Sequence, residues 1–100
     1  MAHAVTYSEF GGPEVLSLSD IEVPAPGPGQ VGVRVTAAGV NPIDHKLRAG
    51  LRPSDTISKP RRVGNDGAGV VTAVGADVDG FRVGDEVVVF GASGVYATDI

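Results

Sequence analysis

Glycine and proline interrupt this chain at short intervals, and their spacing limits the possible folds more than any other feature. Fifteen glycines and seven prolines are spread over 100 residues that contain only five aromatic side chains. Both residue types favour turns and weaken helices, so the sequence predicts short strands joined by turns. The length suits one domain with one core, and no apolar run approaches the roughly 18 residues that cross a membrane.

The first forty residues follow a strand pattern. The runs AHAVTY (2–7) and VLSLSDIEV (15–23) flank the turn sequence SEFGGPE, which predicts a β-hairpin. Three prolines within residues 24–30 exclude a helix or a central strand, so this segment is expected to be an extended connection. The run VGVRVTAAGV (31–40) begins with alternating valines and predicts the next strand.

A short helix is predicted from Pro42 to Ala49, within the stretch GVNPIDHKLRAG. Proline suits the first helical turn, and Gly50 suits the left-handed position after the last turn. Asn41 is among the preferred cap residues, and an acid three positions later can accept the N–H of the cap residue. Asn41 and Asp44 are therefore expected to cap the helix, to form part of a binding site, or to do both.

The second half of the chain predicts three more strands. The polar stretch 51–62 contains two prolines and predicts a loop of more than ten residues, a length that is often functional. Strands are predicted at residues 68–75, 86–90 and 95–100, separated by glycine-containing turns. Six or so short strands with one short helix are typical of a small barrel or sandwich.

The residue types present exclude or disfavour several kinds of protein. The chain has no cysteine, which excludes disulfides and any zinc site built on thiolates. Its net charge of −4 argues against a nucleic-acid surface. The start MAHAVTYSEF has no basic region followed by an apolar run, so no signal peptide is predicted and the cytoplasm is the expected location.

Motifs of catalysis and of nucleotide binding are weak. No Gly-x-Gly-x-x-Gly stretch follows a strand and opens a helix, so no dinucleotide-binding domain is predicted in this chain. His3 and His45 are the only imidazoles, and His45 points about 100° away from its neighbour Asp44 on a helix, so no metal site is predicted. Ser93 lies in the turn GASG and lacks the strand-to-helix elbow of a nucleophilic serine.

The stretches FGGPEVL, VRVTAAGVNPIDHKLRAG and GNDGAGVVTAVGADVDGFRVGDEVVVF occur in this order and cover nearly the whole chain. Together they resemble the N-terminal domain of zinc-independent quinone oxidoreductases, within the medium-chain dehydrogenase/reductase superfamily. The resemblance implies a mainly β, GroES-like, partly open barrel with one or two short helices over residues 1–100. In such enzymes a separate Rossmann domain, expected to be absent here, holds NADPH, and hydride passes to a quinone or another activated double bond.

The same resemblance implies a candidate site. Asn41 stands where zinc-containing relatives have a cysteine, and Asn65 and Asp66 stand where they have a histidine and a glutamate. A zinc-free protein is therefore expected, because an amide is a poor zinc ligand. The position of Asn41 lies beside the nicotinamide and the substrate, and that of Asp44 orders this neighbourhood. Asn41 and Asp44 are thus expected cofactor contacts, and Asn41 an expected substrate contact, while the cofactor carries the chemistry.

Two basic residues depart from the family pattern. Lys46 stands where some members have a tyrosine that faces the cofactor, and Arg52 stands where a tyrosine often lies near the substrate. The resemblance therefore makes Lys46 an expected cofactor contact and Arg52 an expected substrate contact. Their charge could favour an anionic ligand or a phosphate over an aromatic quinone pocket.

The ending VYATDI leaves two interpretations open. Family members are much longer, so the chain is expected to be a truncated domain that is inactive alone. It is then expected to form a homodimer or to self-associate through an unpaired strand edge at 95–100. The alternative is an independent, non-enzymatic co-chaperonin-like module, because Gly69–Gly75 and Val83–Phe90 match the pattern of co-chaperonins. Such a module needs an apolar recognition tripeptide in a mobile loop, and residues 51–62 offer only an isolated Ile57.

Overall fold

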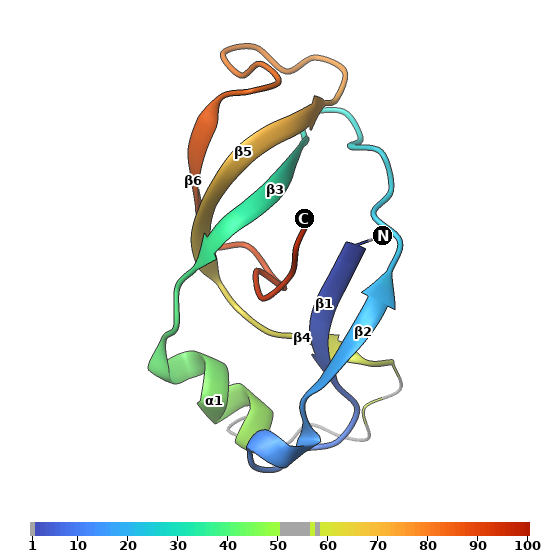
Figure 1. Cartoon of the computed structure of the whole chain (residues 1–100), viewed down its shortest axis with the longest axis vertical. Coiled ribbons are helices and arrows are strands. Elements are labelled where there is room, and N and C mark those ends of the chain that lie inside the picture. The colour runs from blue at the N-terminus through green and yellow to red at the C-terminus, as the bar shows by residue number, and fades with distance from the viewer. Residues whose placement is uncertain (1, 51–56, 58) are drawn as a thin grey trace.

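The computed structural model of the protein describes residues 2–50, 57 and 59–100. These residues form, in chain order, β1 (Ala2–Tyr7), the short 3-10 helix η1 (Pro13–Val15), β2 (Ser17–Ile21), β3 (Val31–Ala38), α1 (Pro42–Ala49), β4 (Arg61–Arg62), β5 (Asp66–Val74) and β6 (Glu86–Phe90). The predicted bounds of α1 and β6 and the predicted hairpin of β1 and β2 are confirmed. Figure 1 shows α1 at one end of the molecule, beside the connection between β1 and β2.

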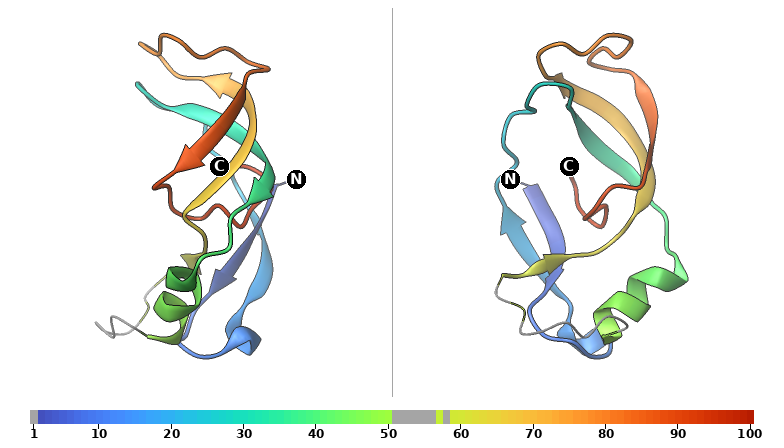
Figure 2. Two further views of the ribbon diagram at one scale, coloured as in Figure 1. Left: turned by 90° about the vertical axis from the view of Figure 1, so that its left-hand side faces the viewer. Right: turned by 180° about the vertical axis from the view of Figure 1, so that it is seen from behind.

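Two antiparallel sheets of three strands each form the body of the described chain. Their strand orders are β2-β1-β4 and β3-β5-β6. Figures 1 and 2 show the second sheet toward the end of the molecule opposite α1. The strand β4 was not predicted: Arg61 and Arg62 pair with Tyr7 and Thr6 of β1, although both lie in the stretch predicted as a loop. This pairing joins residues more than fifty positions apart, which no local pattern indicates.

The C-terminal segment joins the two sheets. Toward β1, Val5 N–H donates to the carbonyl of Tyr96 at 2.8 Å, and Thr98 N–H donates to the carbonyl of His3 at 2.9 Å. Toward β3, Val35 N–H donates to the carbonyl of Thr98 at 2.8 Å. The prediction of a regular strand at 95–100 is therefore wrong, because the segment makes only isolated β-bridges to each side. The expected free edge at this segment is also wrong, because both of its sides are hydrogen-bonded.

Glycines in β5 permit a close approach to β3. A Cβ atom on Gly67 would collide with the carbonyl oxygen of Ala37, and one on Gly69 would collide with the carbonyl oxygen of Arg34. The pairing of the two strands shifts register in the same region, between Val35 and Ala37. Gly67 and Gly69 therefore serve the close packing of β5 against β3.

The core is small, and the edge strand β6 carries exposed apolar side chains. The buried apolar residues are Ala4, Tyr7, Val33, Val63, Val71 and Val95. On β6, which pairs within its sheet only with β5, Val88 and Phe90 are 83% and 85% exposed. The expected mainly β, partly open barrel with short helices is confirmed. Within the part of the chain that the structure describes, no helix has the length and apolarity to cross a membrane.

Candidate functional site

The start of α1 is fixed by a reciprocal pair of hydrogen bonds. Asp44 N–H donates to the carbonyl of Asn41 at 3.0 Å, and Asn41 N–H donates to Oδ2 of Asp44 at 2.9 Å. Pro42 occupies the first turn, and Gly50 ends the helix in the left-handed conformation with φ of 100°. The capping role predicted for Asp44 is therefore confirmed, although aspartate is one methylene shorter than the glutamate usual in a capping box.

Asp44 holds a second donor that the sequence did not reveal. The hydroxyl of Tyr96 donates to the same Oδ2 atom at 2.8 Å, and Asp44 is only 8% exposed. Burial and the hydrogen bond to Asp44 raise the pKa of Tyr96 to about 12, so its phenol stays protonated and donates at neutral pH. No signal in the chain points to Tyr96, because it becomes a neighbour of α1 only when the C-terminal segment returns between the sheets.

The side chain of Asn41 points to a different partner. Its amide Nδ2 donates to Oδ2 of Asp66 at 3.2 Å, and Asp66 is anchored because its carbonyl accepts Gly39 N–H at 2.8 Å. Asn41 and Asp66 are 25 residues apart, and the resemblance had associated both with the ligand positions of zinc-containing relatives. Among the described residues, no three His, Cys, Asp or Glu side chains are grouped so that they could hold a metal ion.

A cavity of about 380 Å³ lies beside this cluster. Asp44 is one of its lining residues, so the hydrogen-bond cluster and the cavity share a carboxylate. The residues around it are Tyr7, Ile43, Asp44, Leu47, Arg62, Val63, Gly64, Asn65, Gly91, Ala92 and Ser93. Most of this wall is apolar or glycine, and a few polar groups converge on it, which is the usual composition of a small-molecule site.

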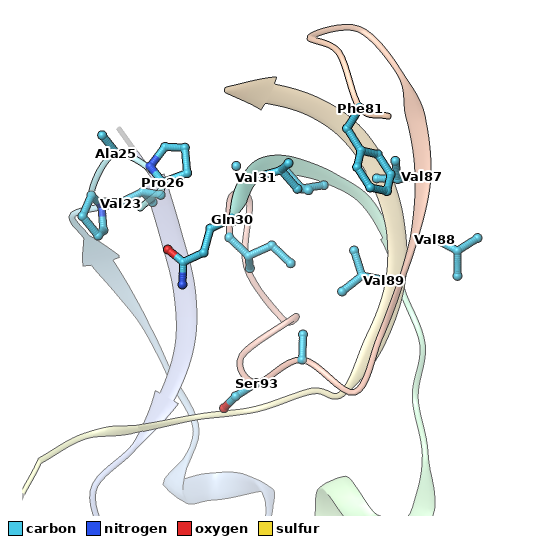
Figure 3. Close-up of a pocket in the computed structure, with 15 residues that line it drawn as sticks. Val23, Ala25, Pro26, Gln30, Val31, Phe81, Val87, Val88, Val89 and Ser93 are labelled. Carbon is cyan, nitrogen blue, oxygen red and sulfur yellow. The ribbon is translucent and has the colours of Figure 1, made fainter. Parts of the chain in front are cut away.

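A second cavity, of about 480 Å³, has a different character. It lies between β3, β6 and the proline-rich segment 23–30, and Figure 3 shows Phe81 and Val89 beside it while Val88 points away. None of the described residues that line it is ionisable, and Gln30 and Ser93 are its polar side chains. It has no charged side chain to orient a reacting group, so the cavity beside Asp44 is the better candidate site.

The other predicted residues fall outside the cluster. Lys46 and His45 are exposed on α1, and neither lines the cavity beside Asp44. Arg52 lies outside the described residues. Ser93 lines the cavity from the exposed turn after β6, and Nδ1 of His3 contacts Oδ1 of Asp20 at 2.8 Å. The structure thus brings together Asn41, Asp44 and Asp66, and adds two residues that the sequence did not single out, Tyr96 and Arg62.

Over the residues that the structure describes, the chain forms a partly open β-barrel with one α-helix, which is the architecture of a GroES-like domain of the kind found in alcohol dehydrogenases. The model of the alcohol dehydrogenase GroES-like domain matches residues 27–98, and the chain belongs to this family.

Relatives and solved structures agree on the branch of the family. The chain is 45% identical over 87 residues to a quinone oxidoreductase of Pseudomonas aeruginosa, and 44% identical over 99 residues to one of Rattus norvegicus. A quinone oxidoreductase structure from Pseudomonas syringae matches the whole chain at 46% identity with a TM-score of 0.89. The Escherichia coli quinone oxidoreductase complexed with NADPH matches 98% of the chain at 30% identity with a TM-score of 0.82. The resemblance to quinone oxidoreductases is therefore confirmed.

The matches cover only part of each relative. The chain corresponds to 26% of the Pseudomonas aeruginosa protein and 30% of the rat protein, although 87% and 97% of the chain itself is aligned. It likewise corresponds to 30% of the Escherichia coli chain. The similarity therefore describes one region of these longer proteins.

Proposed function

We propose that this chain is the N-terminal, acceptor-binding domain of an NADPH-dependent, zinc-free quinone oxidoreductase of the cytoplasm. The observation that carries the proposal is the hydrogen-bonded cluster of Asn41, Asp44, Asp66 and Tyr96, of which Asp44 lines a largely apolar cavity. Its support is the position of Asn41, a neutral amide held rigidly where zinc-containing relatives have a thiolate. The similarity to quinone oxidoreductases along nearly the whole chain adds to this support.

The residues present fit the nicotinamide end of the cofactor rather than the whole of it. Asn41 offers a neutral amide, which can bond to a carboxamide or a substrate oxygen without adding charge. A cavity of about 380 Å³ with an apolar wall suits a ring and not an entire dinucleotide. The remainder of NADPH is expected to be held by a Rossmann domain outside these 100 residues. Lys46 and Arg52 are proposed contacts to cofactor and substrate, on the grounds of their positions in the sequence.

The chemistry is a hydride transfer. When bound, NADPH supplies two electrons and one proton as hydride to the quinone or enone, becoming NADP⁺, and a proton from water completes the reduced product. Asn41 orients the carboxamide or the acceptor oxygen, while Asp44 fixes the backbone of Asn41 and Tyr96 fixes Asp44. Ile43, Leu47 and other apolar groups of the cavity keep water away from the transferred hydride.

The proposal is tested with the natural full-length protein and a simple quinone. We expect menadione-dependent oxidation of NADPH that persists after dialysis against EDTA, because the proposed site uses no metal. Elemental analysis of the same preparation should find far less than one zinc per chain. Absence of NADPH oxidation with quinone and enone acceptors would contradict the proposed function, and stoichiometric zinc would contradict the zinc-free assignment.

We also propose that the 100-residue chain self-associates, through the edge of β6 rather than through residues 95–100. The outer edge of β6 is unpaired among the described strands, and Val88 and Phe90 lie largely exposed on it. Open edges with apolar side chains favour pairing with another copy. Sedimentation of this chain is expected to become faster with concentration, and Val88→Lys should suppress the effect. A concentration-independent monomer would contradict the proposal.

A further inference from the structure

Arg62 is placed in the candidate cavity by long-range contacts. It lies on β4, whose pairing with β1 sets it opposite Thr6, and its side chain lines the same cavity as Asp44. One guanidinium nitrogen, Nη2, donates to the carbonyl of Gly94 at 2.9 Å. A Cβ atom on Gly94 would lie 2.7 Å from Nε of Arg62, so the guanidinium rests directly against the backbone of this glycine. The side chain is therefore held in one orientation.

The charge of Arg62 is not matched by a carboxylate within the described part of the chain. The one contact there between a basic nitrogen and a carboxylate oxygen within 4.0 Å joins His3 and Asp20, on the other side of β1. Nε of Arg62 is buried and has no acceptor among the described residues. Asp44 lines the same cavity, but its Oδ2 already accepts from Asn41 and Tyr96. Arg62 as a whole is half-buried, but a buried N–H without an acceptor is costly, because the hydrogen bond that it made to water is not replaced.

We propose that Arg62 binds a negatively charged oxygen of the acceptor molecule in this cavity. This inference rests on the proposed function and names the chemistry of its substrate. A guanidinium has five donors in a planar fork, of which the described contacts use one, and this fork matches the oxygens of a carboxylate. A carboxylate carries such a charge permanently, whereas a quinone oxygen acquires it when hydride arrives and before a proton from water is added.

The apolar remainder of the cavity limits the size and shape of this acceptor. Ile43, Leu47 and Val63 line the wall together with Arg62, so a compact, flat molecule with an apolar body and an anionic oxygen fits the site. This assigns Arg62 a role in substrate recognition. Phosphate-bearing ligands with long polar chains would leave their polar groups against these apolar side chains.

The test uses benzoate and benzamide, two probes of the same shape that differ in charge, with the natural full-length protein. Isothermal titration is expected to show benzoate binding about tenfold or more tightly than benzamide, because only benzoate makes a charge-assisted hydrogen bond to the guanidinium. Arg62→Gln should abolish this preference, and Arg62→Lys should retain part of it. The matched control is Arg61→Gln, which removes the same charge one residue away, where the guanidinium lies 5.5 Å from the centre of the Phe10 ring.

The possible outcomes are distinct. A wild-type protein that binds both probes equally overturns the inference, and so does an Arg62→Gln variant that keeps the preference. If Arg62→Gln fails to fold, as judged by thermal melting, the wild-type preference and its partial loss in Arg62→Lys decide the matter. A preference for benzoate in a protein that does not oxidise NADPH would support the anion site and reject the proposed function. NADPH oxidation without a preference for benzoate would support the proposed function and reject the anion site.

Discussion

Asp44→Ala is expected to lower the free energy of unfolding by about 3 kcal/mol, because it leaves two donors, Asn41 N–H and Tyr96 O–H, without their shared acceptor. The substitution also removes the residue that fixes the start of α1, so the catalytic rate of the full-length protein should fall as well as its stability. Urea denaturation at pH 7 measures the first effect.

Two milder substitutions test the same cluster. Tyr96→Phe removes only one hydrogen bond to Asp44 and should lower the free energy of unfolding by about 1 kcal/mol. Asp44→Asn keeps the shape of the side chain and one acceptor oxygen. The raised pKa of Tyr96, about 12, gives an independent check. Its stabilising contribution is complete below pH 10 and is lost as pH rises toward 12, because the unfolded chain ionises first. If Asp44→Ala costs no more than Tyr96→Phe, Asp44 does not organise the helix start.

Local signals were sufficient for the parts of the fold that they control. Pro42 in the first turn and Gly50 after the last turn predicted the two ends of α1, and the predicted bounds agree with those of the structure. The alternation of Val31, Val33 and Val35 predicted β3, which runs from Val31 to Ala38. In each case, the residues that determine the element lie within it or next to it.

Long-range pairing explains what the sequence did not reveal. The segment after Gly94 reads as a strand, but it adapts to two different sheets and forms only isolated bridges to β1 and β3. The contacts of Tyr96 with Asp44 and of Arg62 with Gly94 span 52 and 32 residues. Such contacts depend on how the sheets come together, and neither periodicity nor turn residues specify that. The sequence therefore indicated Asn41, Asp44 and, through the resemblance, Asn65 and Asp66, but not Tyr96 or Arg62.

Asn41→Ser in the natural full-length protein has the second large expected effect, and it acts on function. Serine caps helices about as well as asparagine, and Asp44 can still accept the N–H of residue 41, so stability should stay within about 1 kcal/mol of wild type. The variant loses the amide that bonds to Asp66 and that is proposed to orient the cofactor and acceptor. We expect kcat/KM for menadione to fall at least tenfold, as about 1.4 kcal/mol of lost transition-state stabilisation implies. His45→Gln, at an exposed position of the same helix, is the control and should change neither quantity.

We propose that the residues which start α1 also serve the reaction. The most direct test of this proposal is a paired measurement on Asn41→Ser: the free energy of unfolding, and kcat/KM with NADPH and menadione. We expect a nearly unchanged free energy of unfolding together with a kcat/KM reduced at least tenfold. Wild-type values for both quantities would contradict it and leave Asn41 as a helix cap alone.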